Sequence, residues 1–435
     1  MPALGTACIA PSMAWALAGC LPWQAASPGK RAALANWPRR ARDRGTTWAV
    51  NLALSDDERR FRDDIRSWLE ANVEPPPEFA SFADEFDWGR RWQARLAAHR
   101  WVGIQWPTEF GGRGATPLEV AIFNMEYARS RAPQPVNRTG LNLVGPTLLR
   151  HGDDTQRALW LPAILSADEI WCQLFSEPGA GSDLASLSTR ATEVEGGFVV
   201  DGQKVWTSFA QFARWGIALV RTDPEASRHR GLTCMAVDMT APGVEVRPLT
   251  TMTMEAEFNE VFFDEVFVPS GHVIGGRNEG WAVANTTLAH ERGTNFPFRE
   301  QVVHEVYLQQ ILDLAVTCGA LDDELVADQL VDAYVALRIL GYHNWRTMTR
   351  LGHGIEPGPE SSVTKLAWTD MTQQLSEAAL VVLGRAAPLW GAAEANPGRG
   401  RWQRQWLWSK AASIAGGTSE IQKTIIGERI LGLPR

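Results

Sequence analysis

The chain has few cysteines and only a modest charge imbalance, and both limits exclude protein classes. Its five cysteines, Cys8, Cys20, Cys172, Cys234 and Cys318, are widely scattered, so they form neither a disulfide framework nor a metal-ligand spacing. This suits a reducing compartment, and we expect a cytoplasmic protein that holds no metal. The formal net charge of −8 argues against a general polyanion binder, so we expect no nucleic-acid partner.

Long apolar segments are also missing. Residues 7–22 are apolar, but Pro11 and Pro22 interrupt the run and it is too short to span a membrane. No Lys or Arg precedes Lys30, so the charged start of a signal peptide is absent. The Arg-rich run 30–42 leaves a transit peptide open, but we interpret residues 1–50 as a disordered N-terminal extension. We expect no stable membrane insertion.

Helical periodicity begins just after this extension. Ser55 is suited to cap a helix whose apolar face holds Phe61, Ile65, Trp68 and Leu69. Similar patterns continue beyond it, and we expect residues 51–170 to form a helical domain.

The middle of the chain is rich in short β-type runs. Asp201-Gly202 lies between two such runs and predicts a hairpin turn. We expect residues 171–280 to form a small antiparallel barrel or sandwich, and residues 281–435 to form a second helical domain. No βαβ alternation is present, which excludes a Rossmann fold. The predicted fold class is α+β, mainly α.

Glycine-rich turns mark two candidate ligand-binding stretches. SEPGAGSD, residues 176–183, bares backbone N–H groups, although an ordinary interdomain loop has the same composition. In AGGTSEIQ, residues 415–422, Ser419 and Gln422 fit a capping box, while the two glycines can offer N–H groups to a ligand oxygen. KVWTS, residues 204–208, suits a hairpin strand with a core tryptophan as well as a ligand wall. Composition alone leaves these alternatives open.

Together these stretches resemble the acyl-CoA dehydrogenase family. SEPGAGSD, DGQKVWTS, EFNEVFFDEVFVP, NEGW and AGGTSEIQKTIIGERILGLPR follow one another in the family's order across residues 51–435. The resemblance implies an N-terminal helical domain, a middle β-barrel domain and a C-terminal four-helix bundle, assembled as a homo- or hetero-oligomer (a dimer of dimers). It also implies FAD as cofactor, an acyl-CoA substrate and an electron-transfer flavoprotein as electron acceptor.

The resemblance assigns roles to individual residues. It implies that FAD is contacted by Gln173, Phe175, Ser176, Trp206, Thr207, Ser208, Thr418 and Glu420. It places the substrate against Ser182, Arg292, Gly416 and Gly417, with Ser182 on the CoA arm and the glycines at the thioester. The implied reaction is α,β-dehydrogenation, in which a carboxylate removes the α-proton and the β-hydrogen leaves as hydride to flavin N5.

The catalytic base departs from the commonest family pattern. Many members have Glu directly before a Gly-Thr pair, where this chain has Gly416. A minority branch, similar to isovaleryl-CoA dehydrogenase, supplies the Glu from a helix after the β domain. On the matching helix, Glu291 follows Ala284 by seven residues and lies on the apolar face. We predict Glu291 as the base; an ion pair with Arg292 at the helix end is the alternative, and His290 is a weaker candidate.

A second departure concerns the adenine end of the cofactor. The family's Gln-x-x-Gly-Gly-x-Gly turn reads VVLGRAA here, residues 381–387, where Arg385 suits either a phosphate contact or solvent. This keeps open a non-catalytic or half-site subunit of a heteromeric acyl-CoA dehydrogenase, and an acyl-CoA oxidase is a further alternative. A base on the earlier helix leaves room for branched or bulky acyl groups, including sterol side chains.

Overall fold

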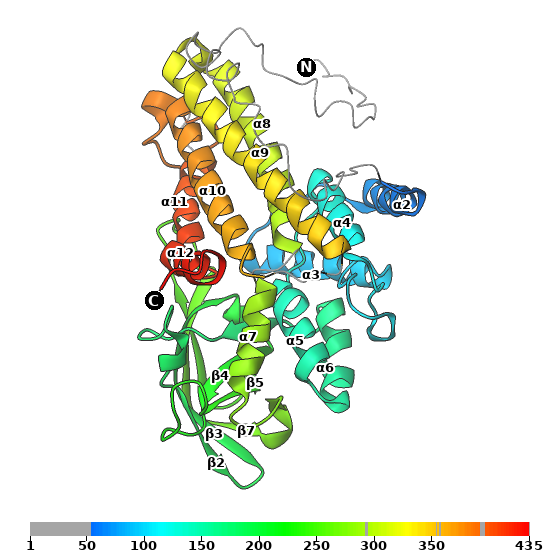
Figure 1. Ribbon diagram of the computed structural model, residues 1–435, viewed down its shortest axis with the longest axis vertical. Helices are drawn as coiled ribbons and strands as arrows, with labels where there is room; N and C mark the ends of the chain where they lie inside the picture. The colour runs from blue at the N-terminus through cyan, green and yellow to red at the C-terminus, as the bar shows by residue number, and fades with distance from the viewer. Residues whose placement is uncertain (1–53, 292–294, 354, 356–357, 392–395, 435) are drawn as a thin grey trace.

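The computed structural model describes residues 54–291, 295–353, 355, 358–391 and 396–434. The predicted extension, residues 1–50, lies outside the described residues. Three regions follow one another along the chain: helices, a β-sheet, and then a group of longer helices (Figure 1). No helix in these ranges is both long and apolar enough to cross a membrane.

Side-chain capping starts several helices of the first region. Ser55 and Glu58 form a capping box at the first helix, and Thr116 with Glu119 does the same at the third. A single π-helical turn, η4, directly precedes α5, and π-helical turns are frequent near functional sites. The elements are α2 (Asp56–Asn72), α3 (Phe82–Ala98), α4 (Pro117–Arg129), η4 (Gly140–Val144), α5 (Gly145–His151) and α6 (Asp154–Ser166).

The middle region is one eight-stranded sheet in the order β6-β7-β3-β2-β4-β5-β8, with β1 also paired to β4. Its strands are β1 (Trp171–Leu174), β2 (Arg190–Val194), β3 (Gly197–Ser208), β4 (Trp215–Arg221), β5 (Leu232–Asp238), β6 (Val244–Leu249), β7 (Phe258–Pro269) and β8 (Val273–Ile274). The sheet differs from the predicted antiparallel barrel. β6 and β8 end it without pairing to each other, and β1 and β2 run parallel to β4.

The predicted hairpin at Asp201-Gly202 is wrong. β3 runs through these residues, and the chain reverses earlier, where Val194 of β2 pairs with Gly197 of β3. Gly202 instead lies at a register shift against β7 with a φ of 148°, and a Cβ there would lie 2.6 Å from the Thr189 hydroxyl. The glycine therefore serves a close approach inside a long strand, which its local sequence does not distinguish from a turn.

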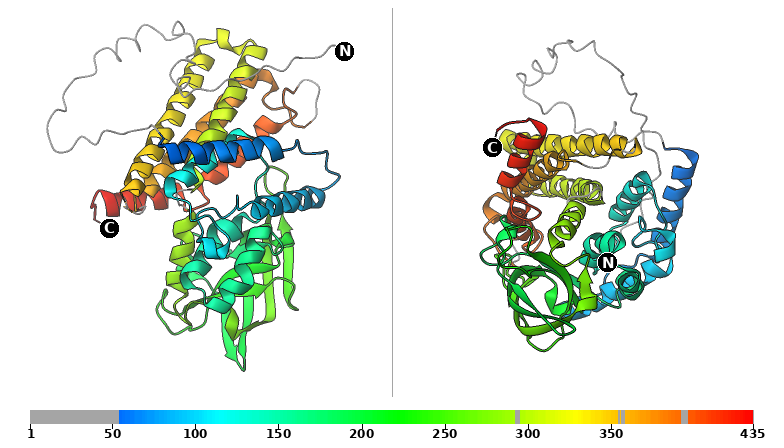
Figure 2. Two further views of the ribbon diagram at one scale, coloured as in Figure 1. Left: turned by 90° about the vertical axis from the view of Figure 1, so that its right-hand side faces the viewer. Right: turned by 60° about the horizontal axis from the view of Figure 1, so that its bottom comes forward.

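The last region is helical. Its elements are α7 (Gly280–Glu291), α8 (Asn295–Thr317), α9 (Glu324–Gly352), α10 (Ser361–Leu383), α11 (Arg401–Ser409) and α12 (Ser419–Ile425). The long helices α8, α9 and α10 pack against one another around Leu330, Leu337, Met371 and Leu375. Figure 2 shows α7 lower down, beside the sheet and the first helical region, apart from this group.

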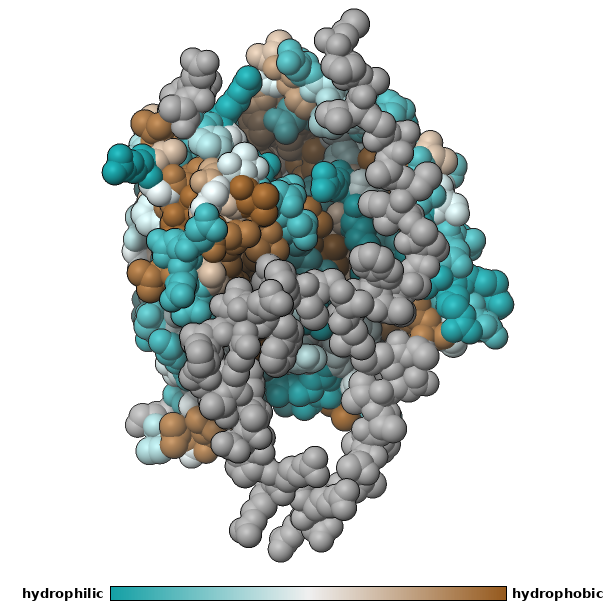
Figure 3. Space-filling view, turned by 90° about the horizontal axis from the view of Figure 1, so that it is seen from above, coloured by the Kyte–Doolittle hydropathy of each residue, from teal (hydrophilic) through white to brown (hydrophobic). Residues whose placement is uncertain are grey.

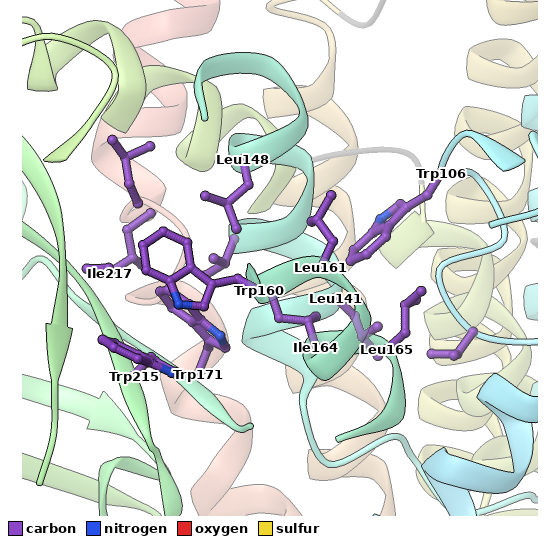
Figure 4. Packing of buried hydrophobic residues seen from close by; sticks show 14 of the residues in the cluster. Trp106, Leu141, Leu148, Trp160, Leu161, Ile164, Leu165, Trp171, Trp215 and Ile217 are labelled. Carbon is purple, nitrogen blue, oxygen red and sulfur yellow. The ribbon is translucent and has the colours of Figure 1, made fainter. Parts of the chain in front are cut away.

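A continuous apolar core joins the first helical region to the sheet. Trp160 of α6 packs edge-on against Trp171 of β1 and Trp215 of β4, with ring centroids 5.4 and 5.6 Å away (Figure 4). All three rings are buried. Burial of such rings accounts for much of the attachment between helices and sheet. The junction therefore fixes β1, and with it the turn that follows, relative to the helices.

Candidate functional site

The glycine-rich turn after β1 is held in place by a buried ion pair. Lys204 of β3 is fully buried, and its Nζ lies 2.8 Å from Oε1 of Glu177. The ammonium also donates to the carbonyls of Phe175 and Leu219, at 3.1 and 2.7 Å. These bonds join the end of β1, the turn and two strands at one point.

Both partners of the pair are electrostatically perturbed. Burial lowers the pKa of Lys204 to about 8, against the attraction of Glu177. Burial also opposes ionisation of Glu177, but the charge and hydrogen bond of Lys204, with further donors from Ser188 and Thr189, lower its pKa to about 2. The carboxylate therefore stays ionised. Neither residue was predicted to belong to the site, although Glu177 lies in SEPGAGSD and Lys204 in KVWTS.

The predicted flavin contacts on β1 and β3 are brought together by this arrangement. The N–H of Val205 donates to the carbonyl of Ser176 at 3.0 Å, which ties the turn directly beside Trp206. Gln173 and Ser176 are partly exposed, whereas Phe175 is buried. The side chains of Gln173 and Ser176, both able to form hydrogen bonds, are therefore accessible at the edge of the sheet next to the indole ring of Trp206.

Trp206 stands out on β3. It is 60% exposed, has a left-handed φ of 61°, and lies where the register against β7 shifts. Its ring makes an edge contact with Phe258 at 5.9 Å. An exposed indole on left-handed backbone is unusual, so this part of β3 is a candidate binding surface. Ser208 lies partly exposed nearby, but Thr207 is buried at 1% because strand side chains alternate between faces.

The C-terminal glycine turn differs in detail from the sequence interpretation. Thr418, rather than Ser419, caps α12, and its hydroxyl accepts from the N–H of Ile421. Gln422 is buried and donates to the carbonyls of Gly416 and Gly417 at 3.0 and 3.2 Å. Both glycines have left-handed φ values, 66° and 93°. A Glu at position 416 would need a conformation that side chains disfavour.

Two further residues predicted to contact FAD or the substrate, Glu420 and Ser182, lie at the molecular surface. Glu420 is exposed in the first turn of α12, and a hydrogen bond from its own N–H, followed by one involving Thr418, lowers its pKa. Ser182 is exposed on the turn after β1, next to Asp183, which pairs with Arg228. α11 is tied to the β6–β7 connection through the Arg404–Glu255 ion pair.

The helix predicted to carry the base packs against the first helical region through hydroxyl groups. Thr287 of α7 and Thr147 of α5 are both fully buried, with their hydroxyl oxygens 2.9 Å apart. The adjacent Thr286 lies 2.8 Å from Nε2 of His151, which follows Thr147 by one turn of α5. Glu291 is the last residue of α7, on the helical face of Ala284 and Thr287. Its side chain lies outside what the structure describes, as does the whole of Arg292.

A further charged residue adjoins the Trp206 edge and was not predicted. Arg138, just before η4, lies with its guanidinium 5.6 Å from the ring centre of Phe209 and 3.8 Å from Oε1 of Glu257. Phe209 directly follows Ser208 and donates its N–H to the carbonyl of Glu257. No spacing in the sequence links Arg138 to these residues. Only the packing of the first region on the sheet brings them together.

Among the described residues, no group of three or more His, Cys, Asp or Glu side chains is placed to hold a metal ion. The side chain of His290 on α7 is accessible to water, and partial desolvation of its ring lowers its pKa.

Three family models match the chain in order. They describe the N-terminal, middle and C-terminal domains of acyl-CoA dehydrogenase and match residues 55–168, 172–266 and 278–431. Acyl-CoA dehydrogenase IpdE1 of Mycobacterium tuberculosis is 40% identical over 389 residues, which is 87% of this chain and 98% of that protein. IpdE1 of Mycolicibacterium smegmatis is 39% identical over 394 residues, covering 86% and 97%.

Solved structures of the same fold include a chain from a named complex. A chain of the ChsE4-ChsE5 complex from Mycobacterium tuberculosis matches with a TM-score of 0.75 and 29% identity, over 88% of this chain and 100% of that one. A structure named Tcur3481-Tcur3483 steroid ACAD also has a TM-score of 0.75, with 27% identity over 88% and 100%.

Proposed function

The chain belongs to the acyl-CoA dehydrogenase family of oxidoreductases, and from that premise we propose that it removes the α-proton of an acyl-CoA thioester with Glu291 as base. The observation that carries the assignment is the backbone at the alternative position. Gly416 has no side chain and a φ of 66°, so the glycine turn offers N–H groups but no carboxylate. α7 is the matching helix of the family branch that takes its base from there.

The accessible residues around Trp206 are suited to contact FAD. The exposed indole supplies a flat apolar wall, and the partly exposed Ser176, Ser208 and Gln173 supply hydrogen bonds. Thr207 is buried on the other face of β3, so we assign it a supporting role rather than a direct contact. Bound FAD would supply the acceptor for the β-hydrogen, which leaves as hydride.

The chain's own groups would do the acid–base work. An α-proton beside a thioester is weakly acidic, so the carbonyl oxygen needs hydrogen-bond donors. N–H groups of the Gly416–Gly417 turn are suited to that, because Gln422 donates to both carbonyls of the turn and holds it in place. Glu291 then takes the proton. The buried hydroxyl pair with α5 holds the helix that carries it.

We further propose that the working form, in the cytoplasm, is an oligomer with a second subunit of the same fold. The turn after α10 lacks the glutamine and two of the three glycines of the family's adenine-binding pattern, so a different neighbouring chain is needed to complete that end of the cofactor site. α9 also exposes Val335, Ile339 and Tyr342 at i, i+4 and i+7. Figure 3 looks down on the helical end of the molecule, where apolar side chains gather around a hollow. A heteromeric partner agrees with the two-subunit complexes that this chain resembles.

The acyl group that we propose is bulky or ring-bearing. A base on α7 frees space beside the glycine turn, and one similar structure is named a steroid acyl-CoA dehydrogenase. Electrons would pass from the reduced cofactor to an electron-transfer flavoprotein.

The base assignment is tested with Glu291→Gln. The purified wild-type protein, alone or with its partner subunit, is expected to be yellow and to oxidise acyl-CoA with a dye acceptor. Glu291→Gln is expected to keep the flavin spectrum and lose turnover by a factor of about a thousand or more, since proton abstraction has no other base. Glu279→Gln, the same change at an exposed residue just before α7, is the control.

Two outcomes would contradict the proposal. Turnover retained in Glu291→Gln would exclude this residue as base. A wild-type protein that stays colourless with every partner would instead support a non-catalytic subunit.

A further inference from the structure

We propose that Arg138 binds an oxygen atom in the acyl group, remote from the thioester, so that the preferred substrate carries a carbonyl or carboxylate there. The inference rests on the proposed dehydrogenation and adds the class of acyl group to it. Neither the family resemblance nor the proposed mechanism assigns a role to the Arg138 guanidinium.

Arg138 is fixed next to the reaction edge. The preceding residue, Asn137, is fully buried and accepts from the N–H of Trp171, the first residue of β1. On its other side Arg138 faces Phe209 and Glu257, which immediately adjoin the paired residues Ser208 and Phe258. Phe258 in turn contacts Trp206. The guanidinium therefore lies at the end of the edge that we assign to the flavin.

The hydrogen-bonding capacity of Arg138 is almost unused. A guanidinium has five N–H donors. Among the described residues, the polar contact of Arg138 is with Glu257 at 3.8 Å, which is too long for a hydrogen bond. Burial lowers the pKa of Arg138, while 44% of the side chain stays accessible to water. A ligand that displaces this water has to supply hydrogen-bond acceptors, because a guanidinium left dry without them is costly.

A second arginine approaches from α8. Arg299 lies in the first turns of that helix, and its positive charge adds to burial in lowering the pKa of Arg138, so the two are near each other. Its Nη1 donates to Glu300, while its Nε is buried and has no partner among the described residues. The charge of Arg299 on α8 is therefore felt at Arg138, together with the opposite charges of Glu257 and Glu300.

The position favours the acyl end of the substrate over its CoA end. We assign the CoA arm to Ser182 and the thioester to the Gly416–Gly417 turn, both outside the first helical region. Arg138 belongs to that region and leads into η4 and α5, which contact the base helix α7 through Thr147. A purely apolar acyl chain would displace water from the Arg138 guanidinium and leave its N–H donors without acceptors. An acceptor oxygen would satisfy them.

The test compares matched substrates on the complete, flavin-loaded enzyme. Octanoyl-CoA is compared with 7-oxooctanoyl-CoA and with the acyl-CoA that ends in a carboxylate, and a second pair adds a ring with and without a ketone. Wild-type kcat/KM is expected to favour the oxygen-bearing member of at least one pair by about tenfold or more, the usual size of a lost charged hydrogen bond. The ketone and carboxylate members tell which oxygen is preferred.

Arg138→Met is expected to remove that preference, and Arg138→Lys to keep part of it. Arg60→Met, an exposed arginine paired with Asp57 on α2, is the control and is expected to keep the wild-type ratio. The inference is overturned if wild type shows no preference, if Arg138→Met lowers both members of a pair equally, or if Arg138→Met loses its flavin, which would make Arg138 a cofactor contact. Oxidation of plain acyl-CoAs without preference would leave the proposed function standing. If no acyl-CoA is oxidised, both fail.

Discussion

At the scale of single residues, the buried ion pair of Lys204 and Glu177 fixes the conformation of the turn between β1 and β2. Glu177 accepts from Lys204, from the hydroxyl and N–H of Ser188 and from the N–H of Thr189. A buried pair of this kind seldom adds much net stability, but leaving one partner alone is costly. Its effect here is conformational, because every bond fixes the turn between β1 and β2.

This pair predicts a pH dependence of stability. The pKa of Glu177 is about 2 in the native protein and 4.5 in its ordinary range, so the native state binds the proton less readily. Its contribution is complete above about pH 4.5 and is lost as the pH falls toward 2. The loss is at most about 3 kcal/mol. Urea unfolding at pH 6, 4.5 and 3 is expected to show a steeper fall for wild type than for Glu177→Gln.

A parallel fall in the two proteins would contradict the role of Glu177. Glu193→Gln, which removes a surface carboxylate paired with Arg277, is the control and is expected to follow wild type.

At the scale of elements, α7 and α5 are joined by hydroxyls inside an otherwise apolar contact. Thr147 also donates to the carbonyl of Leu143 at 2.7 Å, within the π-helical turn η4. The pair therefore links the irregular turn to the helix that ends at Glu291. Hydrogen bonds are directional, so this link restricts how α7 rotates and slides more than apolar packing does.

We expect Thr287→Val to lower the free energy of unfolding by about 1 kcal/mol, because the buried hydroxyl that contacts Thr147, and that also lies 3.1 Å from the carbonyl of Val283, is lost. We also expect turnover to fall several-fold with KM little changed, since the base is displaced rather than the substrate site. Thr287→Ser is expected to restore both. The double variant Thr147→Val with Thr287→Val is expected to lose less than the sum of the single changes.

Thr317→Val provides the matched control for this experiment. Within the described part of the chain, the Thr317 hydroxyl bonds the carbonyl of Asp313 in its own helix, α8, and no other helix. Turnover unaffected by Thr287→Val would contradict a positioning role, whatever the change in stability.

At the scale of the whole molecule, the outer face of α9 lacks a partner among the described residues. Leu325 is 75% and Tyr342 66% exposed, with Val335 and Ile339 between them on the same side. Exposed apolar stripes of this length typically mark subunit contacts. Acyl-CoA dehydrogenases are typically tetramers, so we assign this face to a second subunit of the same fold.

Ile339→Glu is expected to reduce the assembly to smaller species, measured as molar mass by light scattering, with the helical circular dichroism unchanged. Burying an unpaired carboxylate in the contact costs several kcal/mol, enough to dissociate most interfaces of moderate affinity. Asp313→Asn, on the neighbouring α8, is the control. An unchanged mass for Ile339→Glu would place the subunit contact elsewhere.

Much of the local structure was predictable from sequence. The capping boxes at Ser55 and Thr116, the alternating strands and the return of helical periodicity after residue 280 depend on residues a few positions apart. Local signals failed where long-range contacts decide. Gly202 serves a strand instead of a turn, and Thr418 replaces Ser419 as the cap of α12.

The sequence by itself determined the family, the order of the three regions and the absence of a carboxylate at position 416, because motifs and residue types are written along the chain. Only the tertiary structure decided which charged and hydroxyl groups meet. Lys204 finds Glu177 across 27 residues and Thr147 finds Thr287 across 140, and Arg138 reaches Glu257 from another domain. Such pairs depend on strand register and helix packing. The total burial of apolar surface fixes these, and no local pattern encodes them.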